Sequence, residues 1–166
     1  MDMDNEPSTF SPREFAIWLS AWIDADGSIM FLKVHIKDKR HGRRLVNYRP
    51  AVQVTNAYKK PLEYMKNRYG GCIIHCPRKD AEMGWWKWQT ENLTTIKVLK
   101  DVAPFLVRKK EQAEIILDLR KKKITHTYRH RPLTDEEMIL LEECRQKIRA
   151  LNRKHKTGRR KRLIIN

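Results

Sequence analysis

The sequence predicts an α+β fold built on one antiparallel sheet. Segments with helical periodicity alternate with pairs of segments in which apolar and polar residues alternate, in the order α-β-β-α-β-β-α. Polar turns join the members of each pair, as they do in antiparallel hairpins. The chain has 166 residues and 40% of them are hydrophobic, which suits a single domain with its own core. We expect an extension over residues 1–10, one domain over 11–152 and a basic tail over 153–166.

The first helix is predicted from its N-terminal capping signal. Ser11 is a good N-cap residue, a proline follows at the first helical position, and Glu14 completes a capping box. Apolar residues continue to about Asp26, and Gly27 ends the helix. Asp24 and Asp26 need an explanation, because the C-terminal end of a helix carries partial negative charge, which disfavours carboxylates.

Two hairpins are predicted from alternating residues. The first has strands over 28–37 and 45–55, and the second pairs 72–76 with 85–90. The opening strand has one apolar and one basic row: Met30, Leu32, Val34 and Ile36 against Lys33, His35 and Lys37. The next strand places a mostly polar row on one of its faces, formed by Asn47, Arg49, Ala51 and Gln53.

Three further helices are predicted, at about 57–69, 92–103 and 109–123. Two glycines follow the first of these, and a proline follows the second. Thr134 and Glu137 form another capping box, which begins a final helix that ends at about Asn152. The core of the domain then covers about 12–123, and C-terminal helices cover 124–152.

The charge balance indicates a polyanionic partner. Lys and Arg number 36 against 20 Asp and Glu, so the net charge is +16. Such a charge attracts nucleic acid before any other partner. We expect no membrane partner, because no apolar run approaches the length of a membrane span. Three cysteines and an N-terminal segment unlike a signal peptide favour an intracellular protein, in the cytoplasm of a prokaryote or an organelle of a eukaryote.

The first helix also carries a stripe of small residues. Ala21 and Ala25 lie one turn apart, with Trp18 and Trp22 beside them. Small residues at this spacing allow a second helix to approach closely. Two copies packed side by side would bring their acidic ends together, where a divalent cation would offset the charge. The alternative is an ordinary packed helix whose acidic residues are solvated.

Residues 19–27, LSAWIDADG, resemble the LAGLIDADG motif of homing endonucleases and match it at six of nine positions. The likeness extends to "QVTN" at 53–56 and "PFLVRKKEQA" at 104–113. It implies the αββαββα fold of that family, with a saddle-shaped antiparallel sheet. With one motif in the chain, it also implies a homodimer formed through the motif helix by Trp18, Ala21, Trp22, Asp24 and Ala25.

The resemblance further implies the active-site residues. Asp26 would be the metal ligand, assisted by the backbone carbonyl of Ala25. Asn56 stands where the family often has glutamine and would hold solvent near the scissile phosphate. Lys109 would stabilise charge or organise water, and Lys60 would be a further catalytic basic residue. Mg²⁺ suits these oxygen ligands, with Mn²⁺ or Ca²⁺ substituting in binding.

Each hairpin would enter the major groove of double-stranded DNA and offer alternate side chains to the bases. The candidates are Lys33, His35, Lys37, Arg43, Arg44, Asn47, Arg49, Gln53, His75, Arg78, Lys79, Lys87 and Gln89. An alignment without gaps would instead turn Met30 and Leu32 toward the DNA. A bulge or offset in the first strand is therefore expected.

The sequence thus favours a homing endonuclease. Such an enzyme would cleave both strands of a long pseudo-palindromic site by Mg²⁺-dependent hydrolysis, leave short 3′ overhangs and promote intron mobility. One alternative is a maturase that binds intron RNA, and another is a non-catalytic DNA-binding regulator with the same fold. A basic ribosome-associated protein would not require the two acids. A zinc site at Cys72 and Cys76 is disfavoured, because His75 points to the opposite face of the strand.

Overall fold

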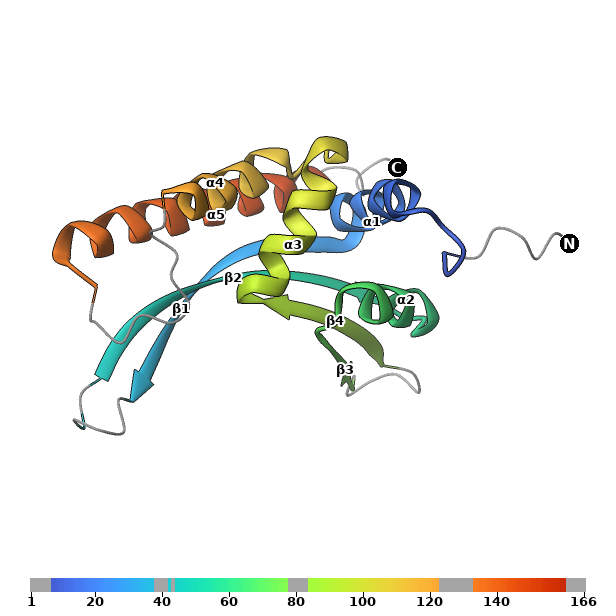
Figure 1. Ribbon diagram of the computed structural model, residues 1–166, viewed down its shortest axis with the longest axis horizontal. Helices are drawn as coiled ribbons and strands as arrows, with labels where there is room; N and C mark the ends of the chain where they lie inside the picture. Colours follow the sequence, from blue (N-terminus) through green and yellow to red (C-terminus); the bar gives the residue numbers. More distant parts are fainter. Residues whose placement is uncertain (1–6, 38–41, 43, 78–83, 123–132, 161–166) are drawn as a thin grey trace, which may run out of the picture.

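The computed structural model describes residues 7–37, 42, 44–77, 84–122 and 133–160, without the side chains of 44 and 154–160. The elements in chain order are α1 (Pro12–Asp26), β1 (Gly27–Lys37), β2 (Arg44–Asn56), α2 (Lys60–Tyr69), β3 (Cys72–Cys76), β4 (Trp85–Glu91), α3 (Asn92–Val102), the 3₁₀ helix η2 (Ala103–Phe105), α4 (Lys110–Lys121) and α5 (Asp135–Arg160). The predicted α+β order is confirmed. Figure 1 shows an arched sheet with α1, α3, α4 and α5 over its convex face.

The four strands form one antiparallel sheet in the order β1-β2-β4-β3. Strands β1 and β2 pair without interruption from Gly27 and Val54 to Lys37 and Arg44. The last part of β2 pairs with β4, which in turn pairs with β3. Strand β2 therefore joins the two hairpins into a single surface.

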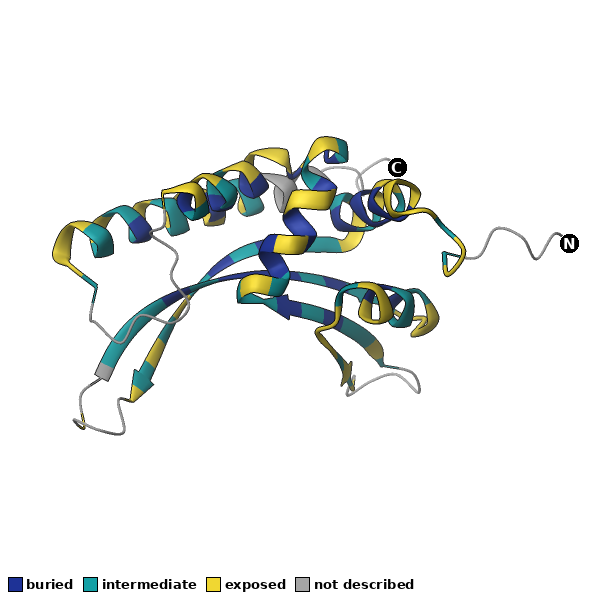
Figure 2. Ribbon diagram, in the orientation of Figure 1, coloured by how far each residue is buried: buried dark blue, intermediate teal, exposed yellow. Residues whose placement is uncertain are grey.

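The core lies between the sheet and the helices above it, and Figure 2 shows buried residues on both the strands and the helices. The sheet contributes Ile29 and Val52 to this core, and α1 contributes Leu19 and Ile23. Each of these four residues has an exposed fraction of 0%. Burying side chains of this size contributes about 1.5–3 kcal/mol each. Trp88 is also fully buried, and its indole N–H donates to the carbonyl of Gly70 over 2.9 Å.

Both predicted capping boxes are present. At α1, the backbone N–H of Ser11 donates to the Glu14 carboxylate and the N–H of Glu14 donates to the Ser11 hydroxyl. At α5, Thr134 and Glu137 exchange the same pair of bonds, at 3.0 and 3.2 Å. Each box satisfies N–H groups that have no partner within the helix, so these ends are fixed by local sequence.

The predicted end of the last helix is wrong. Helix α5 continues to Arg160 instead of ending at about Asn152. Leu141 and Ile148 are buried, and the Asn152 side-chain amide donates to the carbonyl of Ile29 in β1 over 2.9 Å. With the helix anchored there, further Lys and Arg residues extend it, because both are good helix formers and cations are favoured near a helix C-terminus.

Gly27 is required by a close approach at the turn from α1 into β1. A Cβ at this position would lie 2.7 Å from the Ile23 Cα and 3.0 Å from the Gln53 carbonyl oxygen. We therefore expect Gly27→Ala to lower the free energy of unfolding by about 1–3 kcal/mol, because neither backbone can move away freely. Urea unfolding measures this change, with the neighbouring Ser28→Ala as the control. An unchanged midpoint for Gly27→Ala would contradict the close contact.

Candidate active site

Asp24 connects the end of α1 to the turn that leads into α4. Its carboxylate accepts hydrogen bonds from three consecutive backbone N–H groups, those of Val107, Arg108 and Lys109, at 2.7, 3.1 and 2.9 Å. Carboxylates are favoured at the positive N-terminal end of a helix. Asp24 therefore caps the start of α4, which explains why an acid stands at the end of α1.

Lys109 makes the reciprocal connection. Its ammonium group donates to the backbone carbonyls of Ile23 and Asp24, at 2.7 Å each. The last carbonyls of a helix have no partner within it, and a cation there also opposes the helix dipole. The residue has an exposed fraction of only 6%. We call Asp24 and Lys109 together the helix-end clamp, because each one caps the helix that carries the other.

Ala25 and Asp26 follow the clamp directly and are exposed. A carboxylate and a backbone carbonyl are hard oxygen donors of the kind that Mg²⁺ prefers, so this end of α1 fits the expected ligand chemistry. Among the described residues, no group of three His, Cys, Asp or Glu side chains could hold a metal ion.

An exposed stripe of one isoleucine and two alanines runs along α1. Ile17 has an exposed fraction of 45%, and Ala21 and Ala25 follow it at intervals of one turn, both exposed. Trp18 and Trp22 are half-buried and pack against each other, with ring centroids 5.8 Å apart. Of the residues expected at a helix interface, the tryptophans thus partly serve the core. Ile17 was missed by the sequence analysis, although its spacing from Ala21 and Ala25 could have revealed it.

The sheet has one face covered by helices and one that we call the open face. Residues paired across antiparallel strands project to the same side. The buried pairs Ile29–Val52 and Val54–Trp88 mark the covered face. The alternate pairs then lie on the open face, which carries five predicted DNA-contacting residues: Asn47, Arg49, Gln53, Lys87 and Gln89.

Comparison with solved structures identifies the fold. The archaeal intron-encoded homing endonuclease I-Vdi141I, complexed with DNA, is 17% identical with a TM-score of 0.63, over 85% of this chain and 86% of that one. The homing endonuclease I-CvuI, in complex with its target, is 19% identical with a TM-score of 0.54, over 82% and 96%. The LAGLIDADG homing endonuclease I-LtrWI, bound to target DNA, is 17% identical with a TM-score of 0.54, over 84% and 44%. The chain has the LAGLIDADG homing endonuclease fold. No family model and no curated protein matches the sequence.

Within this LAGLIDADG fold, the basic row of β1 lies on the covered face. Lys33 pairs with Tyr48 in the sheet, and its ammonium lies 3.4 Å from the Glu142 carboxylate of α5. The register with β2 contains no bulge, so His35 and Lys37 lie on the same side as Lys33. The bulge or offset expected in the first strand is therefore wrong, because Ile29 and Phe31 enter the core in place of Met30 and Leu32. These three basic residues do not share a face with Asn47, Arg49 and Gln53, and their contacts with DNA stay predictions.

Glu142 fixes Lys33 in this position. Hydrogen bonds from Arg145 above all, and from Tyr48, Gln146 and Lys33, hold the pKa of the Glu142 carboxyl well below its usual range. The Tyr48 hydroxyl donates to this carboxylate over 2.8 Å. The charge of Lys33 is therefore directed toward α5 and away from the open face.

His75 and both cysteines of the second hairpin lie as their alternation predicts. His75 pairs with Trp86, with ring centroids 4.6 Å apart, on the covered side of the sheet. His75 therefore does not share a face with Lys87 and Gln89, and its contact with DNA stays a prediction, whereas Cys72 and Cys76 share the open face. Arg43, Arg78 and Lys79 lie outside the described residues, as does the side chain of Arg44.

Asn56 and Lys60 lie where β2 leads into α2. The side-chain oxygen of Asn56 accepts from the backbone N–H of Tyr58 over 2.8 Å and forms a turn, so α2 begins at Lys60 and not at residue 57. The Lys60 ammonium lies 5.8 Å from the ring centroid of Tyr64. These contacts serve the turn and the helix, and catalytic roles for the two residues stay predictions.

Proposed function

We propose that the protein is a site-specific DNA endonuclease of the LAGLIDADG homing family. The observation that carries the proposal is the end of α1, where the helix-end clamp leaves Asp26 exposed beside it. The similar proteins reported above are homing endonucleases with DNA bound. Promotion of intron mobility belongs to the same proposal.

A homodimer supplies the two active sites that cutting both strands requires. The chain covers 96% of I-CvuI but only 44% of I-LtrWI, so it corresponds to about half of the longer enzyme. The exposed stripe of Ile17, Ala21 and Ala25 offers two small residues, the alanines, of the kind that a close helix pair needs. Two-fold pairing through this stripe would present two Asp26 carboxylates to a pseudo-palindromic duplex. Cleavage of both strands would then leave short 3′ overhangs.

Asp26 and the Ala25 carbonyl would hold the divalent cation, with Mg²⁺ as the catalytic ion. When bound, Mg²⁺ supplies an activated water and shields the phosphate oxygens. Mn²⁺ or Ca²⁺ would take its place in binding. The buried Lys109 ammonium holds the last carbonyls of α1 and so fixes the orientation of the ligands that follow. Duplex DNA would lie along the open face, against Arg49 and Lys87.

The first test uses the wild-type protein and duplexes selected from a randomised library by affinity. We expect a dimer that cleaves a selected duplex with Mg²⁺ and not with EDTA. Ala21→Leu should overpack the helix pair, weaken dimerisation by about tenfold or more and lower double-strand cleavage in parallel. Ala150→Leu, at an exposed position of α5, is the matched control. Sedimentation and cleavage assays measure both effects, and a wild-type monomer or an unchanged Ala21→Leu dimer would contradict the model.

Binding of intron RNA, as in a maturase, is the second candidate function. Exposed basic side chains also lie on the helical side of the molecule, among them Lys37 of β1 and Arg149 and Arg153 of α5. The two arginines line a pocket of about 330 Å³ between α5 and β1. RNA bound there would not be displaced by duplex DNA, which distinguishes this function from cleavage alone.

A further inference from the structure

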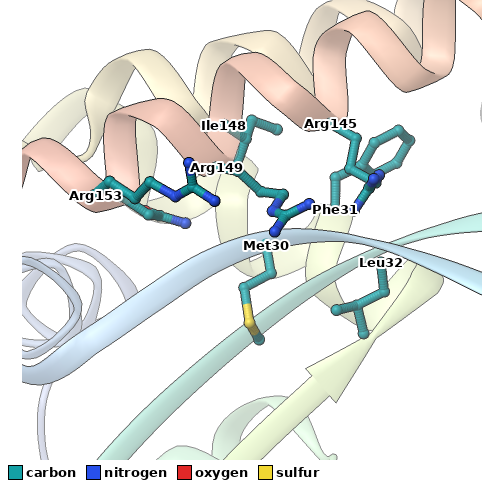
Figure 3. A pocket seen from close by; sticks show the side chains of 8 residues that line it. Met30, Phe31, Leu32, Arg145, Ile148, Arg149 and Arg153 are labelled. Carbon is teal, nitrogen blue, oxygen red and sulfur yellow. The ribbon is translucent and has the colours of Figure 1, made fainter.

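The open face of β1 carries a row of apolar side chains. It consists of Met30, Leu32, Val34 and Ile36, together with Leu45, which pairs with Ile36 across the hairpin. All five are only partly buried. Figure 3 shows Met30 and Leu32 pointing away from α5, on the opposite side of the strand from Phe31. We call this row the apolar stripe.

The apolar stripe is not part of the core. The core of this hairpin lies on the other face, where Ile29, Phe31 and Tyr48 are buried. The helices that contact β1, among them α1 and α5, lie on that covered side (Figure 1). A contiguous row of partly exposed apolar groups is unfavourable in water and commonly marks a binding surface.

Polar residues of β2 run beside the apolar stripe and indicate its occupant. Leu32 pairs with Arg49 and Val34 pairs with Asn47, so an apolar row and a hydrogen-bonding row share one ribbon. The chain has a net charge of +16, which suits a polyanion. A two-stranded ribbon fits the major groove, where hydrogen-bonding groups and one apolar group, the thymine methyl, are exposed on the base edges.

The spacing of the stripe fits this groove. Alternate residues of a strand are about 6.6–6.8 Å apart, and two base steps of B-DNA cover about 6.8 Å. Successive side chains of the stripe can therefore meet every second base pair. We propose that the apolar stripe reads thymine methyl groups, so that each half-site carries thymines beneath β1. This inference rests on the proposed function, because it requires duplex DNA on the open face.

The test measures binding to chemically altered duplexes. Duplexes are selected by affinity from a randomised library, and each thymine of the best one is replaced in turn by deoxyuridine, which lacks only the methyl group. At positions beneath β1 we expect about fourfold weaker binding for each methyl removed, as for the loss of one buried methylene. Where a cytosine lies beneath β1, replacing it by 5-methylcytosine adds a methyl group at the same ring position and should strengthen binding.

Protein variants assign the effect to the stripe. Leu32→Ala and Val34→Ala should each lose the preference for thymine over deoxyuridine at one position of the duplex. His35→Ala changes a residue on the covered face and should keep the wild-type preference at every position. Circular dichroism verifies that each variant is folded, and the two stripe variants test the inference separately. Selection of a duplex that tolerates deoxyuridine everywhere, or unchanged preferences in both variants, would overturn this inference alone. Failure to select any duplex would overturn the proposed function as well.

Discussion

Asp26→Asn should abolish cleavage, by about 10³-fold or more, while duplex affinity stays equal or rises. Metal coordination contributes several kcal/mol to the stabilisation of such a transition state, and asparagine replaces a charged ligand by a neutral one. Removing a negative charge that faces phosphates does not weaken DNA binding. Asp26 is exposed, and the amide has nearly the same shape, so the fold should be unaffected.

The measurement compares single-turnover cleavage with binding to the same selected duplex. Asp118→Asn is the matched control, because Asp118 is also exposed but pairs with Lys121 on the surface of α4. It should cleave at the wild-type rate. Full cleavage by Asp26→Asn would remove the proposed ligand, and loss of binding together with cleavage would point to a defect in DNA contact.

The elements of the fold could be predicted because their signals are local. Ser11 and Glu14 are three residues apart, as are Thr134 and Glu137, so these boxes could be recognised in sequence and are present in the structure. The orientation of β1 could not be predicted in the same way. Its odd-numbered residues include Ile29 and Phe31, and its even-numbered residues from Met30 to Ile36 are all apolar. Alternation alone therefore does not show which row enters the core.

The geometry of the site depends on contacts that spacing does not reveal. Asp24 and Lys109 are 85 positions apart, and only the contact between the end of α1 and the turn that precedes α4 brings them together. The resemblance named both residues but could not show that one caps the helix of the other. The covered position of Lys33 likewise depends on Glu142, which is 109 positions away on α5.

Lys109→Met should destabilise the fold as well as impair cleavage. Loss of the ammonium removes this donor from the part-buried Asp24 carbonyl and leaves the Ile23 carbonyl with only the backbone N–H of Gly27. We expect the free energy of unfolding to fall by about 2–4 kcal/mol, the cost of leaving buried polar groups unpaired next to a carboxylate. Urea unfolding without DNA or metal measures this, with Lys110→Met as the control, because Lys110 is the exposed neighbour.

Because Asp24 and Lys109 touch the same two chain segments, their effects should not add. Asp24→Asn keeps the shape of the side chain but loses its charge and part of its capacity to accept three N–H groups. The double variant should therefore lose less stability than the sum of the single variants, by about 0.5–3 kcal/mol. A lysine that acts only on the reacting water or phosphate would behave differently. Lys109→Met would then unfold at the wild-type urea concentration and lose activity alone, and that result would contradict the helix-end clamp.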